Sequence, residues 1–367
     1  MLNGHPVIDA DSHIHDYHLD WPSLLPPSLR DVAPRTYYEP TGFPHIDVEG
    51  RLLPGGEHDM KARARETTRD PRFWEPPRNG EFEAAPRLPD MDEMGIDTCV
   101  LFGGHCFLVA SKVESSDVAN ATLRAYNEYL GAFCATAPSR LKGVAMIAMQ
   151  SPAVAAGELE RAVLDLGLVG AVLPPHHANG TTLDDPSLDP IWATAERLDV
   201  PVCIHTIGAQ ISPIEPMLSG VVMGHAYGSI PSMLALGHLI LGGVLDRFPQ
   251  LTVCFLEAGA GWVPYFMDRI EGNYEMFGAR SRQLRQAPAE YVRGDQLYFA
   301  ADPDETTLPA VVDAIGADRL VIGSDYCHPE GMCPFTMKVL ANRDDLGLDV
   351  RRKILYDNPK RLYRLAS

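Results

Sequence analysis

Short apolar runs recur along the chain and alternate with longer segments of helical character. Eight runs rich in β-branched residues lie at 7–14, 98–103, 141–149, 167–173, 201–206, 251–257, 296–301 and 319–325. Several are apolar at consecutive positions, as in Val202-Cys203-Ile204 and Leu320-Val321-Ile322, rather than at every second position. This pattern is typical of parallel strands that are covered on both faces.

Seven further segments predict helices, at 115–135, 152–166, 186–198, 231–247, 262–276, 305–315 and 349–356. Some begin with a helix-start signal, such as Ser151-Pro152 or Asp304-Glu305, in which a side-chain oxygen accepts a bond from a free backbone N–H and proline fits the first turn. Eight strands that alternate with helices predict an α/β chain folded as a (β/α)8 TIM barrel.

Residues 16–87 interrupt this alternation. Prolines are spread through the segment, as in Pro26-Pro27 and Pro76-Pro77, and proline is incompatible with long regular elements. A linker or a disordered tail would account for the prolines, but aromatic residues such as Trp21 and Trp74 favour an ordered structure. We therefore expect one domain over 1–367, in which 16–87 is inserted after the first strand as an irregular cap at the catalytic end.

The composition narrows the class of protein. The 367 residues include 31 basic and 49 acidic residues, which gives a formal charge of −18, and nucleic acid is therefore not an expected partner. No run reaches the roughly 18 uninterrupted apolar residues of a membrane helix, and the first residues lack the features of a signal peptide, so we expect a cytoplasmic protein. The seven cysteines include no Cys-x-x-Cys pair and are expected to be mostly buried free thiols.

The end of the first predicted strand is rich in carboxylates and imidazoles. It reads Asp9-Ala10-Asp11-Ser12-His13-Ile14-His15. Asp11 and His13 lie two positions apart, so their side chains point to the same side of a strand. On an inward face the two residues could bind one metal ion, and a polar loop with ordinary surface residues is the alternative.

Two other strands end in a single polar residue. Taken alone, His205 is typical of a hydrogen-bonded core histidine, and Asp325 is typical of a helix cap. A barrel, however, brings the carboxyl ends of its first, fifth and eighth strands to one mouth, where active sites of this fold lie. Four buried polar groups left without partners would each cost roughly 2–7 kcal/mol. One divalent cation would satisfy all four.

Together these motifs resemble the amidohydrolase superfamily, specifically its branch that contains aminocarboxymuconate-semialdehyde decarboxylase and the resorcylate decarboxylases. The resemblance covers nearly the whole barrel. It rests on Asp11-Ser12-His13, His205, the run Phe255-Leu256-Glu257-Ala258-Gly259-Ala260-Gly261-Trp262, and Gly323-Ser324-Asp325-Tyr326.

The resemblance implies one divalent ion bound by Asp11, His13, His205 and Asp325, with Asp11 as a shorter carboxylate than the glutamate found in some members. Two imidazole nitrogens and two carboxylate oxygens suit Zn²⁺, which is the first expectation. Mn²⁺ is the competitor, because oxygen ligands favour harder ions.

One position departs from the family pattern. The similar decarboxylases carry a histidine where Glu257 falls by its spacing from His205 and Asp325. An imidazole can donate a hydrogen bond to a carboxylate or a developing oxyanion, whereas an ionised glutamate cannot. Glu257 is therefore expected to act as a base, to act as an acid after a rise in its pKa, or to orient another group.

Six further residues are expected to contact the substrate: His15, His105, His176, His177, Arg269 and His328. The histidines follow predicted strands. Arg269 falls where similar decarboxylases have an arginine that reaches a neighbouring subunit's substrate carboxylate, and pairing on its own helix surface is the alternative. Apolar helical positions such as Met233-Leu234-Ala235-Leu236 are compatible with a homodimer and equally with core packing.

The first functional hypothesis is metal-dependent, non-oxidative decarboxylation of an aromatic or unsaturated carboxylic acid, in which Asp325 helps to move a proton onto the carbon that loses CO₂. The second is hydrolysis of an ester, lactone, amide or C–C bond by metal-bound water, with Asp325 as the general base. Hydration of a double bond, with Glu257 handling the proton, and a non-catalytic barrel are the remaining alternatives. No Gly-x-Gly-x-x-Gly or Walker-type motif indicates an organic cofactor.

Overall fold

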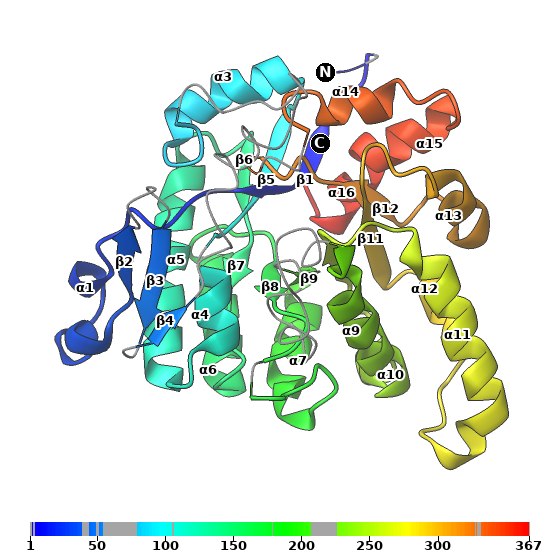
Figure 1. Cartoon of the computed structure of the whole chain (residues 1–367), viewed down its shortest axis with the longest axis horizontal. Helices are drawn as coiled ribbons and strands as arrows, with labels where there is room; N and C mark the ends of the chain where they lie inside the picture. Colours follow the sequence, from blue (N-terminus) through cyan, green and yellow to red (C-terminus); the bar gives the residue numbers. More distant parts are fainter. Residues whose placement is uncertain are drawn as a thin grey trace.

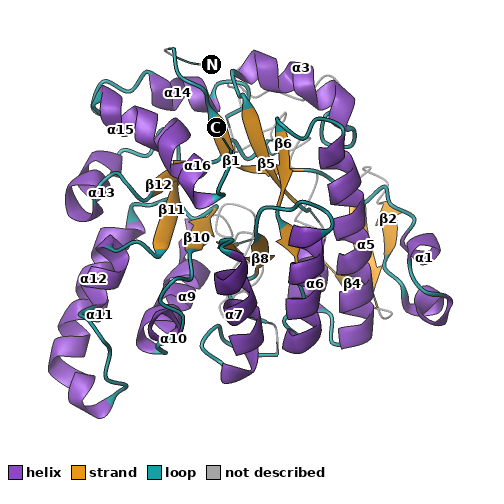
Figure 2. Cartoon of the chain, turned by 180° about the vertical axis from the view of Figure 1, so that it is seen from behind, coloured by secondary structure: helices purple, strands orange, loops and turns teal. Residues whose placement is uncertain are grey.

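The computed structural model of the chain describes residues 2, 4–38, 44–48, 51–53, 79–104, 106–177, 179–206, 226–326, 328 and 332–366. Parallel strands stand at the centre, and helices pack around them (Figure 1 and Figure 2). The central strands are β1 (Ile8–His13), β5 (Thr98–Phe102), β6 (Leu141–Gly143), β7 (Ala145–Met146), β8 (Ala171–Leu173), β9 (Val202–His205), β10 (Val253–Leu256), β11 (Leu297–Ala301) and β12 (Leu320–Ile322).

The strands form a closed ring. Parallel pairing runs in the orders β1-β5-β6 and β12-β11-β10-β9-β8-β7. At one junction, β6 and β7 are consecutive parts of one barrel strand. Between them, Val144 N donates to Leu101 O of β5 at 3.0 Å. At the other junction, Asp325 N donates to Asp11 O at 3.1 Å and His13 N donates to Tyr326 O at 2.6 Å. These bonds close the barrel, so the predicted α/β TIM barrel is confirmed.

Consecutive burial explains why the strands lack alternation. All four residues of β9 and all four of β10 are buried, because helices cover one face and the barrel interior covers the other. Six of the seven cysteines are buried free thiols, as expected, and Cys327 lies outside the described residues. Within the described chain, no helix is both long enough and apolar enough to cross a membrane.

Each of the seven predicted helical segments contains a helix, and the segment at 231–247 is divided into two. These helices are α5 (Ser116–Ala135), α6 (Pro152–Leu164), α7 (Asp189–Leu198), α9 (Ser229–Leu241), α10 (Val244–Arg247), α11 (Trp262–Phe277), α13 (Leu308–Ile315) and α15 (Leu348–Arg352). The sequence pattern did not predict α3 (Ala84–Met94), α4 (Cys106–Lys112), α12 (Pro288–Arg293), α14 (Thr336–Ala341) and α16 (Asn358–Leu362). Helix α4 is buried at its first six residues, so it has no polar face from which a helical period could be recognised.

The segment expected to be a cap contains short regular elements. Helix α1 (Trp21–Leu24) precedes the antiparallel sheet of β2 (Arg35–Tyr38), β3 (Pro44–Val48) and β4 (Arg51–Leu53), which lies to one side of the barrel in Figure 1. Trp21 and Ile46 are fully buried, in agreement with the order inferred from the aromatic residues. Helix α3 crosses the expected boundary at residue 87. The division of the chain into one barrel with an insert at 16–87 stays a prediction.

A buried asparagine stabilises the point where β6 gives way to β7. Asn127 on α5 donates to Met146 O at 3.0 Å and accepts from Met146 N at 2.9 Å, so its amide group replaces a neighbouring strand. Its Nδ2 also donates to Glu158 on α6 at 2.9 Å. This amide therefore connects α5 and α6 to the interrupted strand. A buried backbone N–H or C=O without a hydrogen bond at this point would destabilise the fold.

We expect Asn127→Ala to lower the free energy of unfolding by about 3 kcal/mol, because three buried hydrogen bonds are lost and Met146 keeps two unmet backbone groups. Chemical denaturation measures this change. The control is Asn273→Ala, which removes an exposed amide that bonds only one carbonyl of its own helix and is expected to cost less than about 0.5 kcal/mol. Equal effects of the two substitutions would contradict this account of the junction.

Candidate metal centre

Side chains from two strands meet at the carboxyl end of the barrel. Asp11 and His13 come from β1, His205 ends β9, and all three are buried, with 3%, 1% and 1% of their surface exposed. One ligand atom from each lies within 4.8 Å of the others. A second such group joins His13 to Asp325 and His328. His13 thus belongs to both groups, and the four residues predicted to bind metal are brought together.

Backbone carbonyls determine the tautomers of the two buried histidines. His13 Nδ1 lies 3.0 Å from Gly103 O, and His205 Nδ1 lies 2.6 Å from Thr206 O. A carbonyl only accepts hydrogen bonds, so each Nδ1 carries the proton and each Nε2 of the neutral ring carries a lone pair. Metal-binding histidines are held in this way.

The lone pairs face atoms that also lack hydrogen-bond partners. Among the described residues, Asp11 Oδ1, His13 Nε2 and His205 Nε2 are buried without a hydrogen bond. Asp11 oxygens lie 3.7 Å from His13 Nε2 and 3.4 Å from His205 Nε2. Acceptor atoms turned toward one another in this way fit a shared cation and would be unfavourable without one.

The fourth residue, Asp325, sits directly after β12 with a φ of 52°, in the left-handed region that is uncommon for a residue with a side chain. Its Oδ1 lies 3.1 Å from His13 Nε2 and 2.7 Å from His328 Nδ1. The rings of His13 and His328 are stacked, with centroids 4.4 Å apart. Backbone strain of about 1–3 kcal/mol is typical of residues held at functional sites.

Charges around the centre influence the protonation states. Burial, together with repulsion from His328, lowers the pKa of His13, which favours the neutral ring that a metal requires. Burial alone would raise the pKa of Asp325, but His328 and His13 outweigh it and hold this pKa well below its usual range. Asp325 is therefore ionised at neutral pH.

Glu257 lies beside His205. It follows β10 with a φ of 51°, and its Oε2 is 3.3 Å from His205 Nδ1. Thr206 Oγ1 donates to Glu257 O at 2.9 Å, which ties the ends of β9 and β10 together. The Glu257 side chain is 20% exposed, so it contacts the imidazole and also reaches the open mouth.

A cavity of about 330 Å³ opens beside the centre. Five carboxylates line it, from Asp11, Glu257, Asp302, Asp304 and Asp325. None of its described lining residues is a lysine or an arginine. Desolvation and the neighbouring Glu305 raise the pKa of Asp302 to about 6. The mouth is thus rich in hydrogen-bond acceptors, and a bound divalent cation would offset part of its negative charge.

The fully buried side chain of Arg87 forms hydrogen bonds with the last residues of β1. Arg87 Nη1 donates to His13 O at 2.8 Å, its Nη2 donates to Ser12 Oγ at 2.5 Å, and its guanidinium lies 4.4 Å from the centre of the Tyr326 ring. Nearby, Asp9 accepts from Ser324 N at 2.8 Å and from Ser324 Oγ at 2.5 Å. Burial raises the pKa of Asp9 to about 6 despite these bonds. The network couples β1 to the residues after β12.

Four other predicted substrate residues lie within the described chain but outside the two groups. The His15 ring is 4.8 Å from Tyr17 and 6.1 Å from His328, at the edge of the centre. The other three are His176 and His177, whose Nδ1 atoms bond within their own loop, and Arg269, which is exposed on α11. His105 lies outside the described residues. Substrate contact by these residues stays a prediction.

Several residues of the site were not predicted from the sequence. Asp302 directly follows β11, so the strand-end rule that identified Asp325 would also have found it. Glu305 accepts from Ala260 N at 3.0 Å and thereby holds the loop after Glu257. Phe107 stacks on His205 with centroids 4.6 Å apart, and no local pattern signals this contact because α4 is buried throughout its first six residues.

We expect Arg87→Lys to weaken metal retention and to lower the free energy of unfolding by about 2–4 kcal/mol, because lysine has one nitrogen where two guanidinium nitrogens bond to His13 O and Ser12 Oγ, and it lacks the planar group that lies over Tyr326. Metal content after dialysis against a chelator and a denaturation curve measure the two effects. The matched control is Arg124→Lys, at a side chain that is 54% exposed. Unchanged retention and stability in Arg87→Lys would show that this contact does not support the centre.

Comparison with known proteins agrees with this architecture. The family model described as "Amidohydrolase" matches residues 8–365. The chain is 30% identical over 263 residues to a gamma-resorcylate decarboxylase of Polaromonas sp., a match that covers 65% of this chain and 76% of that protein. It is 32% identical over 214 residues to the 2-amino-3-carboxymuconate-6-semialdehyde decarboxylase of Dictyostelium discoideum, with 56% of each chain covered.

A similar solved structure is the 5-carboxyvanillate decarboxylase of Novosphingobium aromaticivorans, complexed with manganese and 4-hydroxy-3-methoxy-5-nitrobenzoic acid. Its TM-score is 0.73 at 20% sequence identity, and the superposition covers 99% of this chain and 97% of that one. This likeness supports the TIM barrel. Since the family match spans nearly the whole sequence, the chain belongs to the amidohydrolase family.

Proposed function

We propose that the chain is a metal-dependent, non-oxidative decarboxylase of an aromatic or unsaturated carboxylic acid. The observation that carries the proposal is the convergence of three buried atoms without hydrogen-bond partners, Asp11 Oδ1, His13 Nε2 and His205 Nε2, at the mouth of the barrel. The gamma-resorcylate and 2-amino-3-carboxymuconate-6-semialdehyde decarboxylases among its relatives support this reaction class.

The proposed cofactor is one divalent ion held by Asp11, His13 and His205, with Asp325 as the fourth ligand. Such an ion, when bound, supplies positive charge that orients the substrate carboxylate and stabilises charge that develops during the reaction. Zn²⁺ is the first choice for this donor set, and the manganese in the carboxyvanillate decarboxylase supports Mn²⁺ as the competitor.

Asp325 and His328 are proposed to move the proton. Decarboxylation replaces the substrate carboxylate by a hydrogen, so one proton must reach the carbon as CO₂ leaves. Asp325 is ionised in the resting site and must first receive that proton. His328, whose Nδ1 lies 2.7 Å from Asp325 Oδ1, is the group placed to relay it.

The acceptor-rich cavity suggests which substrates bind. Glu257 and Asp302 can accept hydrogen bonds from hydroxyl or amino groups of a substrate whose carboxylate faces the metal. A carboxylate turned toward the same side chains would be repelled. We therefore expect hydroxylated aromatic acids to bind better than acids with a second carboxylate on that side.

Hydrolysis remains the second candidate, and one observation favours it. An ionised Asp325 is ready to act as a general base toward water without first receiving a proton. The two reactions leave different products, which allows a direct experimental choice.

We predict that His205→Ala and Asp325→Asn each reduce turnover by at least about a thousandfold, because each removes a ligand or the proton-handling group. Circular dichroism is expected to show a folded barrel in both variants, and His205→Ala is expected to purify without stoichiometric metal. The control is His238→Ala, which removes an imidazole on α9 that pairs with Asp184 in a turn. Full activity in either site variant would rule out the proposed centre.

We predict CO₂ release from at least one member of a panel of hydroxybenzoates and unsaturated acids, without incorporation of ¹⁸O from labelled water into the product. Mass spectrometry and a CO₂ assay follow both signals in one reaction. Incorporation of ¹⁸O without CO₂ would reject the decarboxylase and support the hydrolase.

We also infer a cytoplasmic homodimer. Exposed apolar side chains lie on α11, which carries Arg269, and on the neighbouring helix α9. They are Leu234 and Leu241 on α9 and Tyr265, Met276 and Phe277 on α11. A second subunit would cover part of this surface and bring Arg269 toward a neighbouring site. Light scattering after size-exclusion chromatography is expected to give twice the chain mass of 40.2 kDa, and a monomer would refute the dimer.

A further inference from the structure

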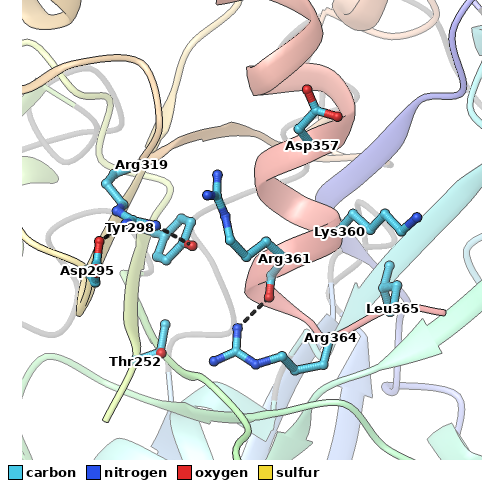
Figure 3. A pocket seen from close by; sticks show the side chains of 9 residues that line it. All are labelled: Thr252, Asp295, Tyr298, Arg319, Asp357, Lys360, Arg361, Arg364 and Leu365. Atoms are coloured by element: carbon cyan, nitrogen blue, oxygen red, sulfur yellow. Dashed lines mark hydrogen bonds and ion pairs between the residues drawn. The ribbon is translucent and has the colours of Figure 1, made fainter. Parts of the chain in front are cut away.

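A second cavity lies at the other end of the barrel, where the strands begin. Thr252 precedes β10, Asp295 precedes β11 and Arg319 precedes β12, whereas the metal centre lies where the strands end. The cavity has a volume of about 760 Å³ and is shown in Figure 3. We call it the basic cavity; its lining residues are Thr252, Asp295, Tyr298, Arg319, Asp357, Lys360, Arg361, Arg364 and Leu365.

The charge of this cavity is opposite to that of the chain. Four of its lining residues are cationic and two are carboxylates, although the whole chain has a formal charge of −18. The carboxylates are already engaged, because Asp295 pairs with Arg319 and Asp357 lies 3.0 Å from Arg352 Nε, outside the cavity. The cavity therefore has an excess of positive charge, which attracts anions.

Arg319 is held rigidly at the base of the cavity. Its Nε donates to Gly294 O at 3.1 Å, its Nη1 donates to Tyr298 Oη at 2.9 Å, and its side chain is only 12% exposed. Burial and the nearby Arg361 both lower the pKa of Arg319, as expected for two cations held close together. Asp295, which pairs with Arg319, offsets part of this repulsion.

Arg361 supplies the second guanidinium. In Figure 3 its side chain extends from α16 toward Arg319 and Tyr298. Its Nη2 donates to two neutral acceptors, Asn358 Oδ1 at 2.7 Å and Asp318 O at 3.2 Å, and no carboxylate pairs with it among the described residues. Arg364, by contrast, already pairs with Asp199 at 2.7 Å. Arg361 is thus the cation most available to a ligand.

We propose that the basic cavity is a binding site for a small dianion with oxygen acceptors, carried as a phosphate group or as a dicarboxylate. Guanidinium groups bind such anions through paired N–H donors. Arg361 supplies the guanidinium that contacts the anion, and Arg319, which is already paired with Asp295, lines the same cavity. The site lies apart from the metal centre and does not depend on the reaction that occurs there.

The test is a calorimetric titration of the full chain with inorganic phosphate at neutral pH, with sodium chloride adjusted to hold the ionic strength constant. We expect saturable binding of one phosphate per chain. Arg361→Gln is expected to weaken it by about tenfold or more, because a charge-assisted contact is lost. The matched control, Arg197→Gln, removes an exposed arginine that pairs with Glu160 on the helical surface and is expected to bind as the unmodified chain does.

Parallel titrations with glycerol phosphate and succinate identify the ligand chemistry, since a phosphate site prefers the first and a dicarboxylate site prefers the second. Melting curves confirm that Arg361→Gln is folded. Binding in none of the titrations above the chloride background would overturn the proposal, and so would equal binding by Arg361→Gln and Arg197→Gln. Loss of activity at the metal centre would not affect either result, so the two proposals fail independently.

Discussion

Closure of the barrel between β1 and the residues after β12 is the constraint on which the candidate site depends. The backbone of Asp325 bonds to Asp11 O, and the backbone of His13 bonds to Tyr326 O, so residues more than 300 positions apart are held side by side. Because parallel strands present their carboxyl ends to one mouth, this closure also brings His205 within reach. Slippage between β1 and β12 would separate Asp11 from Asp325.

The closure holds polar groups in positions that are unfavourable without a ligand. The Nε2 atoms of His13 and His205 point at the carboxylates of Asp11 and Asp325, and Glu257 and Asp325 both adopt left-handed backbone conformations. Buried contacts from Arg87 and Asp9 keep the strands in register beneath them. Such a preorganised set of donors is expected where binding of a cation and charge development in a reaction offset the cost.

Several parts of this structure could be predicted from the sequence for physical reasons. Consecutive apolar residues mark strands covered on both faces, and His205 and Asp325 are recognisable because each comes at or just after the end of such a run. Asp11 is recognisable for a different reason, because the end of the first strand is rich in carboxylates and imidazoles. Helix α4 could not be predicted, since its burial leaves no period. The contact between Arg87 and His13 spans 74 residues and depends on the path of the segment between them, which prolines and aromatic residues do not determine.

The most direct measurement is a crystal structure with anomalous diffraction data collected at the absorption edge of the metal found in the purified protein. We expect one anomalous peak at about 2.0–2.3 Å from Asp11, His13 Nε2, His205 Nε2 and Asp325. Ordered Asp11, His13 and His205 side chains with no peak between them in metal-supplemented crystals, or a peak held by other residues, would contradict it.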